Sequence, residues 1–124
     1  MAWPDVPVNF QAKHALFDDY WKPRTVAETN GYEIRVAKFK GEFVWHHHAN
    51  GDETFVITSG VLQIEMKDRE TVTLHPGDLF VVPAGLEHRP VSPGGCDVIL
   101  LEPPNTRNTG NRTDHDLTTD SPRI

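Results

Sequence analysis

Three histidines and one glutamate have the residue types and spacing of a possible metal site. His46 and His48 are two residues apart in a strand-like run, so we expect both rings on one face of a strand and His47 on the other. Glu53 follows across a short turn, and His88 follows another turn further along the chain. Imidazole binds Mn, Fe, Co, Ni, Cu and Zn, and a carboxylate lowers the cost of burying a dication. Four ligands from three strands could therefore converge on one divalent ion.

Two interpretations of this cluster are open on the residues alone. Three His and one Glu would leave positions free on a six-coordinate ion, where water, dioxygen or a chelating substrate would bind. Three consecutive histidines could equally form the solvated end of a strand. The spacing of these residues does not decide between a metal site and an exposed polar run.

The elements that would position these side chains are short strands. Between residues 31 and 102, apolar or alternating runs rich in Val, Ile, Phe and Thr are separated by Gly, Pro, Asn and Asp. We expect strands at 32–39, 43–48, 53–58, 61–66, 71–74, 79–82, 88–91 and 97–101. A turn is expected at Pro93-Gly94-Gly95, between the last two strands. This pattern predicts an all-β sandwich, jelly roll or barrel.

The composition narrows the class of protein. The chain has 124 residues, which fits one domain. Its net charge is −6 with Lys and Arg scattered, so we expect no nucleic-acid partner. No apolar run reaches the ~20 residues of a bilayer span, which argues against a membrane protein. Lone Cys96 and the lack of a secretory signal favour a cytoplasmic location, and a small molecule becomes the expected partner.

Two groups of residues resemble the two motifs of the cupin superfamily. The first motif has a glycine, a His-x-His pair, a glutamate and another glycine, matched by Gly41, His46, His48, Glu53 and Gly60. The second has a glycine, Pro-x-Gly and a histidine, matched by Gly77, Pro83, Gly85 and His88. Gly41 is one residue closer to the histidines than usual, and Ser92 stands where Asn is usual. The resemblance covers about residues 40–102.

This resemblance implies a fold, a ligand set and an assembly. The implied fold is an all-β double-stranded β-helix, or jelly-roll barrel, with a metal near one mouth. The implied ligands of one divalent ion are His46, His48, Glu53 and His88. The ion could be Fe, Mn, Ni, Zn, Co or Cu, because affinity follows availability and the Irving–Williams order. Cupins are frequently homodimers, so a homodimer is expected.

Three segments are expected along the chain. Residues 1–30 look like an N-terminal arm that packs on the barrel or on a dimer partner, 31–103 form the cupin barrel, and 104–124 form a C-terminal tail. The tail is rich in Asn, Thr, Asp and Arg with few apolar residues, so we expect it to be surface-lying or flexible. His14 and His115 lie in the terminal segments and are expected to be solvated.

Three functional hypotheses follow. The leading one is a mononuclear metal enzyme of the oxidoreductase or dioxygenase type that acts on a small organic substrate, because the ligand set leaves coordination positions open. The second is a metal-dependent isomerase or lyase, resembling small cupins described as sugar-phosphate-isomerase-like, which needs an acid or base near the substrate. The third is a non-catalytic small-ligand-binding module. One fold hosts all three classes, so the fold does not choose among them.

A few further residues are candidates for chemistry. Glu42 shares the face of the ligands if its strand is unbroken and is the candidate acid or base; an exposed glutamate at a strand end is the alternative. Arg35 and Arg89 could contact an anionic substrate or be ordinary surface arginines. Asp78 is expected to stabilise its own turn through side-chain to backbone bonding.

Overall fold

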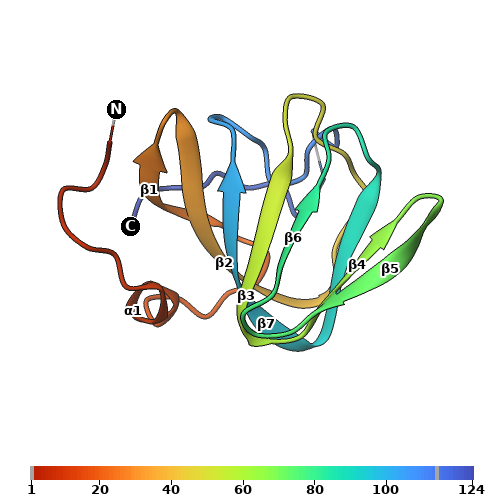
Figure 1. Ribbon diagram of the computed structural model, residues 1–124, viewed down its shortest axis with the longest axis horizontal. Coiled ribbons are helices and arrows are strands. Elements are labelled where there is room, and N and C mark those ends of the chain that lie inside the picture. The colour runs from red at the N-terminus through yellow and green to blue at the C-terminus, as the bar shows by residue number, and fades with distance from the viewer. Residues whose placement is uncertain (1, 114) are drawn as a thin grey trace.

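One short helix and seven strands form the computed structural model, which describes residues 2–113 and 115–124 (Figure 1). In chain order the elements are α1 (Phe10–His14), β1 (Arg24–Thr29), β2 (Tyr32–Glu42), β3 (Glu53–Gly60), β4 (Leu62–Met66), β5 (Arg69–Leu74), β6 (Leu79–Val82) and β7 (His88–Glu102). No helix in the described ranges is long and apolar enough to cross a membrane.

The strands assemble around the long strand β7. The hydrogen-bonded order is β1-β2-β7-β3-β6, while β4 pairs with β7 and with β5. All of these pairings are antiparallel. The first residues of β7, His88 to Val91, pair with β4, whereas Cys96 to Leu101 lie between β2 and β3. The expected all-β architecture is confirmed, although the ladder among the described residues does not close and β1, β5 and β6 lie at its ends.

Strand β7 replaces two expected strands and the turn between them. Its register against β2 shifts between Phe39 and Gly41, which leaves the three residues 93–95 of β7 opposite Lys40 alone. Gly95 has a φ of 89°, a conformation that glycine adopts without steric cost. The Pro-Gly-Gly sequence therefore makes a bulge that bends the strand rather than a turn that ends it.

Two other segments differ from the prediction. The expected strand 43–48 is not part of a ladder; within the described residues its one pairing is an isolated bridge between His46 and His88. Conversely, β1 lies inside the expected N-terminal arm and forms a hairpin with β2. The hairpin turns at Asn30 and Gly31, whose φ values of 50° and 78° suit a two-residue turn. This Asn-Gly pair is a hairpin signal that the sequence analysis overlooked.

Side-chain alternation places a carboxylate in the core. On β3, Glu53, Phe55 and Ile57 are buried, whereas Thr54 and Val56 between them are partly exposed. Successive strand residues point to opposite faces, so Glu53 enters the same interior as the apolar residues. Its charge consequently needs partners within the fold.

The segment before β1 packs on the sheet through Trp21 and His14. The Trp21 ring stacks on Phe39 and Phe43, with ring centroids 4.4 and 4.7 Å away. His14 is 3% exposed, and its ring nitrogens lie 3.0–3.2 Å from backbone carbonyls of α1, β2 and β7. The prediction that His14 is solvated is wrong, because carbonyls from three elements converge on its ring.

Polar contacts anchor the C-terminal tail. The Thr25 N–H donates to the Pro122 carbonyl over 2.9 Å, and the Ile124 N–H donates to the Thr25 carbonyl over 3.1 Å, which places the C-terminus beside β1 (Figure 1). Asn108 and Thr109 are buried. This differs from the loosely held tail that the composition predicts, because Asn and Thr side chains can anchor a segment by bonding to backbone groups.

Candidate metal centre

The four residues predicted as ligands converge in the folded chain. His46, His48, Glu53 and His88 are all buried, and one potential ligand atom from each lies within 4.8 Å of the others. The backbone brings two of them together, since His46 and His88 exchange N–H···O bonds of 3.0 and 2.9 Å. Glu53 comes from the core face at the start of β3. The two sequence motifs therefore meet at one point.

Backbone carbonyls orient two of the imidazole rings. Nδ1 of His46 lies 2.8 Å from the Val44 carbonyl, and Nδ1 of His88 lies 2.9 Å from the Leu86 carbonyl. A carbonyl can only accept, so each Nδ1 carries the proton and donates it. Nε2 of each ring is then left to bind a metal ion, the arrangement commonly found around ligating histidines.

The donor set fits a single divalent ion. Nε2 of His48 is buried without a hydrogen-bond partner among the described residues, although Glu53 Oε2 lies 3.4 Å away. A buried polar atom left unpaired is costly, and a metal ion would satisfy it. Opposite ligands on an ion with bonds of about 2.1 Å lie about 4.2 Å apart. The observed limit of 4.8 Å is close to that span, so a small contraction would complete the coordination.

Burial and neighbouring charges shift the pKa values of these groups in different directions. Burial and the charge of His88 lower the pKa of His46 to about 3. Burial also acts to lower the pKa of His88, but the hydrogen bond and negative charge of Glu53 outweigh it and raise that pKa. Burial alone would raise the pKa of Glu53, yet the charge of His48 and the hydrogen bonds it accepts bring it well below its usual range. Glu53 is therefore a carboxylate, the form that binds metals.

A second carboxyl group, which the sequence analysis missed, lies beside Glu53. Glu102 is the last residue of β7, is 1% exposed and hydrogen-bonds to Glu53. Its Oε2 lies 2.6 Å from Nη1 of Arg35, which also donates to the Thr106 carbonyl over 2.8 Å. Arg35 is thus the buried ion-pair partner of Glu102. It is neither an ordinary surface arginine nor free to contact an anionic substrate, the two roles considered from the sequence.

Glu102 supports Glu53 by hydrogen bonding. Burial and the negative charge of Glu53 raise the pKa of Glu102 well above its usual range, and Arg35 opposes this rise without cancelling it. Of the two carboxyl groups, Glu102 is therefore the one that binds a proton more readily, while Glu53 stays ionised. Val98, Leu100 and Glu102 are all buried on β7, so the period-2 pattern was a signal that could have identified this residue.

Two spaces adjoin the four side chains. A cavity of about 290 Å³ lies between the loop 47–53 and the segment 102–111, and His48 and Glu53 are part of its lining. A space of about 20 Å³ on another side of Glu53 is lined mainly by apolar side chains, including Trp21. The larger cavity offers a route for a ligand, whereas the aromatic side limits access by water.

Three of the other residues considered lie outside this cluster. Glu42 pairs with Arg89 at 3.0 Å, and Arg89 also pairs with Glu65 at 2.6 Å. Strand β2 ends at Glu42, so its alternation does not continue to the histidines, and the proposed acid or base role of Glu42 needs correction. The ring of His47 lies 3.1 Å from the Glu87 carboxylate, apart from its two neighbours.

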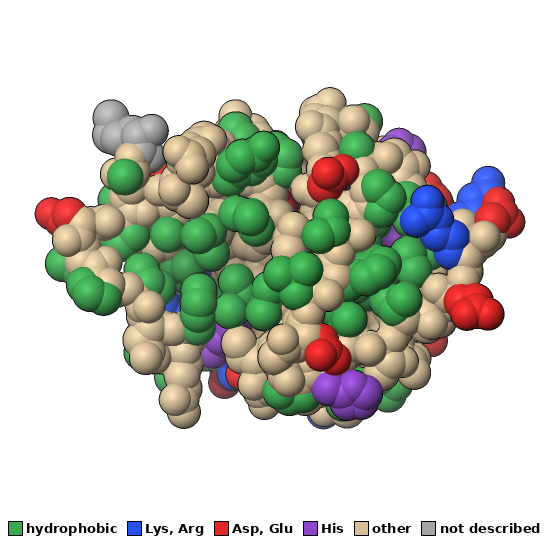
Figure 2. Space-filling view, in the orientation of Figure 1, with side chains coloured by type: hydrophobic (Ala, Val, Ile, Leu, Met, Phe, Trp, Pro, Cys, Tyr) green, Lys and Arg blue, Asp and Glu red, His purple; other side chains and the backbone are tan. Residues whose placement is uncertain are grey.

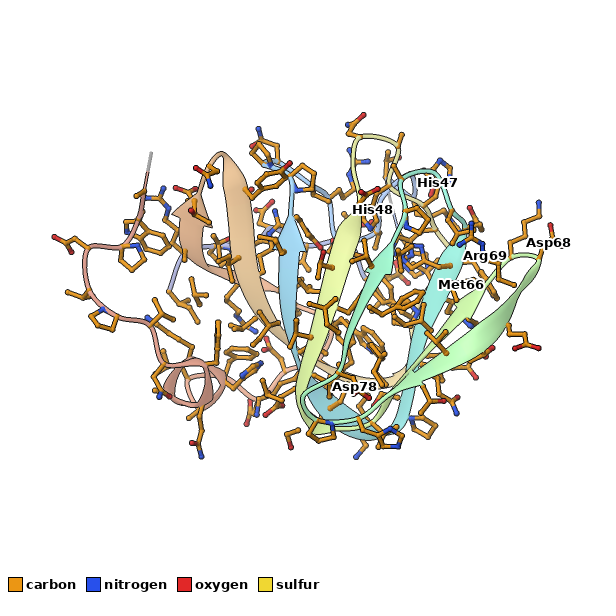
Figure 3. All side chains as sticks on the ribbon, viewed as in Figure 1. His47, His48, Met66, Asp68, Arg69 and Asp78 are labelled. Carbon is orange, nitrogen blue, oxygen red and sulfur yellow. The ribbon has the colours of Figure 1, made fainter. Side chains whose placement is uncertain are left out.

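The side chains of Asp78 and Ser92 form hydrogen bonds with backbone groups. Figure 3 shows Asp78 at the opposite end of the sheet from His48, where its carboxylate accepts the His75 N–H over 2.8 Å, as expected for a turn residue. Ser92, at the position where cupins usually have Asn, is buried and donates its hydroxyl to the Val61 carbonyl over 2.7 Å. Ser92 therefore bonds to the backbone between β3 and β4, and it is not one of the four candidate ligands.

Comparison with known proteins agrees with this architecture. A cupin-2 domain protein from Shewanella frigidimarina is 43% identical, with a TM-score of 0.75, over 77% of this chain and 93% of that chain. The uncharacterized protein YdbB of Bacillus subtilis is 40% identical over 77 residues, which are 62% of this chain. The matched region also spans 62% of YdbB, less than two thirds of that relative.

A more distant structure shares the fold alone. Hydroquinone 1,2-dioxygenase from Sphingomonas sp. TTNP3 is 20% identical, with a TM-score of 0.71, over 78% of this chain and 32% of that chain. The family model of the cupin domain matches residues 33–103, which include both motifs and all four candidate ligands. On the strength of that match, the chain belongs to the cupin family.

Proposed function

We propose that this cupin is a mononuclear metal-dependent oxidoreductase of the dioxygenase type, acting on a small organic substrate. One observation carries the proposal: four buried potential ligand atoms lie within 4.8 Å of one another beside a cavity of about 290 Å³. An ion held there would supply Lewis acidity and, as iron or manganese, redox chemistry. The dioxygenase from Sphingomonas shows that an enzyme with this fold can have dioxygenase activity, but it gives no information about the substrate of this chain.

Different residues of the chain would bind the ion, position its ligands and admit the substrate. His46 and His88 present their Nε2 atoms because backbone carbonyls hold their Nδ1–H groups. Glu53 adds one negative charge, which offsets part of the charge of a dication. Glu102 holds the Glu53 carboxylate in position, and the aromatic side chains around Trp21 keep bulk water from that side. A substrate would enter through the larger cavity, beside His48.

The first test is metal content followed by oxygen uptake. Protein expressed without a His tag, as wild type, His88→Ala and His47→Ala, is analysed for bound metal. We expect about one equivalent in the wild type and in His47→Ala, and little in His88→Ala. Anaerobic loading with Fe(II) and a screen of small oxygenated compounds then follow. Oxygen consumption that requires both iron and a substrate supports a dioxygenase; compounds that bind without oxygen uptake argue against it.

A metal-dependent isomerase or lyase is the second candidate, and Glu102 favours it. This reaction class needs an acid or base near the substrate, and Glu102 lines the cavity as a buried carboxyl group whose pKa is raised by burial and by the charge of Glu53. Product formation in the absence of oxygen, lost in Glu102→Gln with the metal retained, would support this candidate. A protein that binds metal and ligand but turns over neither with nor without oxygen would be a binding module.

We also propose that two copies associate through the outer face of the sheet. Two cross-strand rows on β2, β7, β3 and β6 carry no charge and consist of Ile34, Leu101, Thr54 and Val81, and of Val36, Ile99, Val56 and Leu79; Val36, on β2, is already buried within the chain, so the available part of its row is Ile99, Val56 and Leu79. Figure 2 shows hydrophobic side chains gathered over this face, where Leu79 is 59% and Val81 43% exposed. An uncharged face suits a twofold contact with itself.

Light scattering of the purified protein tests the homodimer. Val81→Asp should shift the mass from dimer to monomer, because a buried unpaired carboxylate is costly at an interface. Val61→Asp is the matched control, since Val61 is similarly exposed but lies outside the two rows. A monomeric wild type, or equal dissociation by both variants, would contradict this assembly.

A further inference from the structure

We propose that the cavity beside the four candidate ligands binds a small organic anion, and that the guanidinium of Arg107 pairs with its carboxylate. This inference rests on the proposed function in taking the cavity as the place of the substrate. Two segments form its walls: the ligand loop, residues 47–53, and the C-terminal strap, residues 102–111. The proposal names the substrate class and the residue that selects it.

Close backbone packing holds the strap against the ligand loop. A Cβ added at Gly51 would overlap the ring of Pro103, and one added at Gly110 would overlap the carbonyl of His47. Asn111 then accepts the His47 N–H on its Oδ1 over 3.0 Å. Close packing and a hydrogen bond therefore hold the two walls of the cavity together.

The acidic groups that line the cavity already have partners. Asp52 accepts the backbone N–H of Ala84 over 2.8 Å, which turns its carboxylate toward that turn. Glu102 lies 2.6 Å from the Arg35 guanidinium, and Glu53 faces the imidazoles. These partners offset the negative charge of the lining, so an incoming anion would not meet an uncompensated carboxylate.

Arg107 is the cationic residue of this lining. Its Nη1 donates to the carbonyl of Gly110, another residue of the lining, over 2.8 Å, which holds the guanidinium against the strap. That is the one hydrogen bond that the described residues provide to its side chain, whereas a guanidinium has five N–H donors. The remaining donors can form the two parallel bonds that a carboxylate accepts.

The other donors of the lining complement the same ligand. Because Oδ1 of Asn111 is taken by the His47 N–H, the side-chain NH₂ is the end left for a cavity ligand. A dication with one carboxylate ligand would add net positive charge at the inner end of the cavity. The volume of about 290 Å³ corresponds to roughly ten water molecules, which limits the ligand to a small acid.

Arg107→Gln tests the assignment, with Arg112→Gln as its matched control. Arg112 lies on the same stretch of chain and also donates to a backbone carbonyl, that of Trp45, but it is not part of the cavity lining. The probes are acetate, succinate and benzoate, each compared with its neutral amide. Binding is followed by ¹⁵N–¹H NMR of the Arg107 side chain and the Asn111 amide, in zinc-loaded and in metal-free protein.

We expect at least one carboxylate to shift both resonances, with its amide binding more weakly. Its affinity should fall about tenfold or more in Arg107→Gln and stay unchanged in Arg112→Gln, since hydrogen bonds between charged groups are among the stronger ones in proteins. The inference is overturned if none of the three carboxylates shifts these resonances, if amides bind equally well, or if both variants lose affinity alike.

Zinc stoichiometry in the same samples separates this inference from the proposed function. Carboxylate binding that depends on Arg107 in a protein without bound zinc would sustain the anion site and count against the metal enzyme. One equivalent of bound zinc without any carboxylate binding would support the metal site and contradict the anion site. Zinc is suitable because it has no redox chemistry and leaves the NMR signals sharp.

Discussion

The candidate metal centre and the C-terminal strap face each other across one cavity, but different contacts hold them. Paired backbone bonds join His46 to His88, and β3 carries Glu53 into the core. The strap is held by one backbone bond, from the Asn111 N–H to the His47 carbonyl over 3.1 Å, by the Asn111 side chain, which accepts the His47 N–H, and by a glycine packed on the loop. The candidate metal centre thus faces a wall that few backbone bonds join to it.

Arg35 connects these two regions. One Nη1 atom serves both Glu102, which supports Glu53, and the carbonyl of Thr106 in the strap. We therefore expect three kinds of variant: those that affect metal binding at the centre, those that affect the attachment of the strap, and those that affect both.

Removal of a ligand should have the largest effect, and on the centre alone. We expect Glu53→Ala to abolish stoichiometric metal binding, because it removes the carboxylate of the set. Elemental analysis and hydrogen exchange of residues 102–111 measure the two regions separately. His47→Ala serves as the control and should retain the metal. Loss of protection in the strap on Glu53→Ala would mean that the two regions are not independent.

Arg35→Met should affect both regions. It leaves the buried Glu102 without its cation and the Thr106 carbonyl without its donor. Breaking one side of a buried ion pair costs about 3–5 kcal/mol, and we expect the free energy of unfolding in urea to fall by about that much. Arg89→Met, in a partly exposed pair, should cost at most about 1 kcal/mol. Equal losses for the two variants would refute the structural role of the Arg35 pair.

Gly110→Ala should loosen the strap and disturb the metal centre less than removal of a ligand does. Its φ of 56°, the overlap of a Cβ with the His47 carbonyl and the approach of that Cβ to 3.1 Å from Cδ2 of His46 all oppose a side chain. Strain of this kind costs about 1–3 kcal/mol, so we expect faster hydrogen exchange in the strap and a smaller loss of metal than in Glu53→Ala. Gly94→Ala is the control, because its Cβ would meet open space. A strap that keeps its protection in Gly110→Ala would show that the glycine contact is dispensable.

The smallest effect expected is a difference in pH response within the centre. In metal-free protein the pKa of His46 is about 3, below its unfolded value, so its contribution to stability is present above about pH 6.5 and is lost as the pH falls. The pKa of His88 is raised, so its contribution is present below about pH 6.5 and is lost as the pH rises through the folded value.

Histidine NMR titration measures both groups directly. The His46 ring should stay neutral through the range where His88 loses its proton, and added zinc should remove both titrations because the metal competes with protons for Nε2. A His46 signal that titrates near pH 6.5 would contradict the burial of this ring.

Most of the sheet and the candidate ligand set could be predicted from local patterns. Alternating runs predicted strands where β3 and β4 lie, and the spacing of the two motifs pointed to the residues that converge. Glu42 was misjudged because alternation holds within one strand, and β2 ends there. The Pro-Gly-Gly sequence was interpreted as a turn because a bulge depends on the partner strand.

The sequence by itself determined an all-β fold, because side-chain periodicity and turn chemistry act over a few neighbouring positions. Its resemblance to the two cupin motifs pointed to the residues that are brought together as a candidate metal site. Tertiary structure alone decided that Glu102 pairs with Arg35 and that a polar tail forms the wall opposite His48. Those contacts join residues far apart in the chain, and their strength comes from burial. No local pattern records which distant partner will satisfy a buried charge.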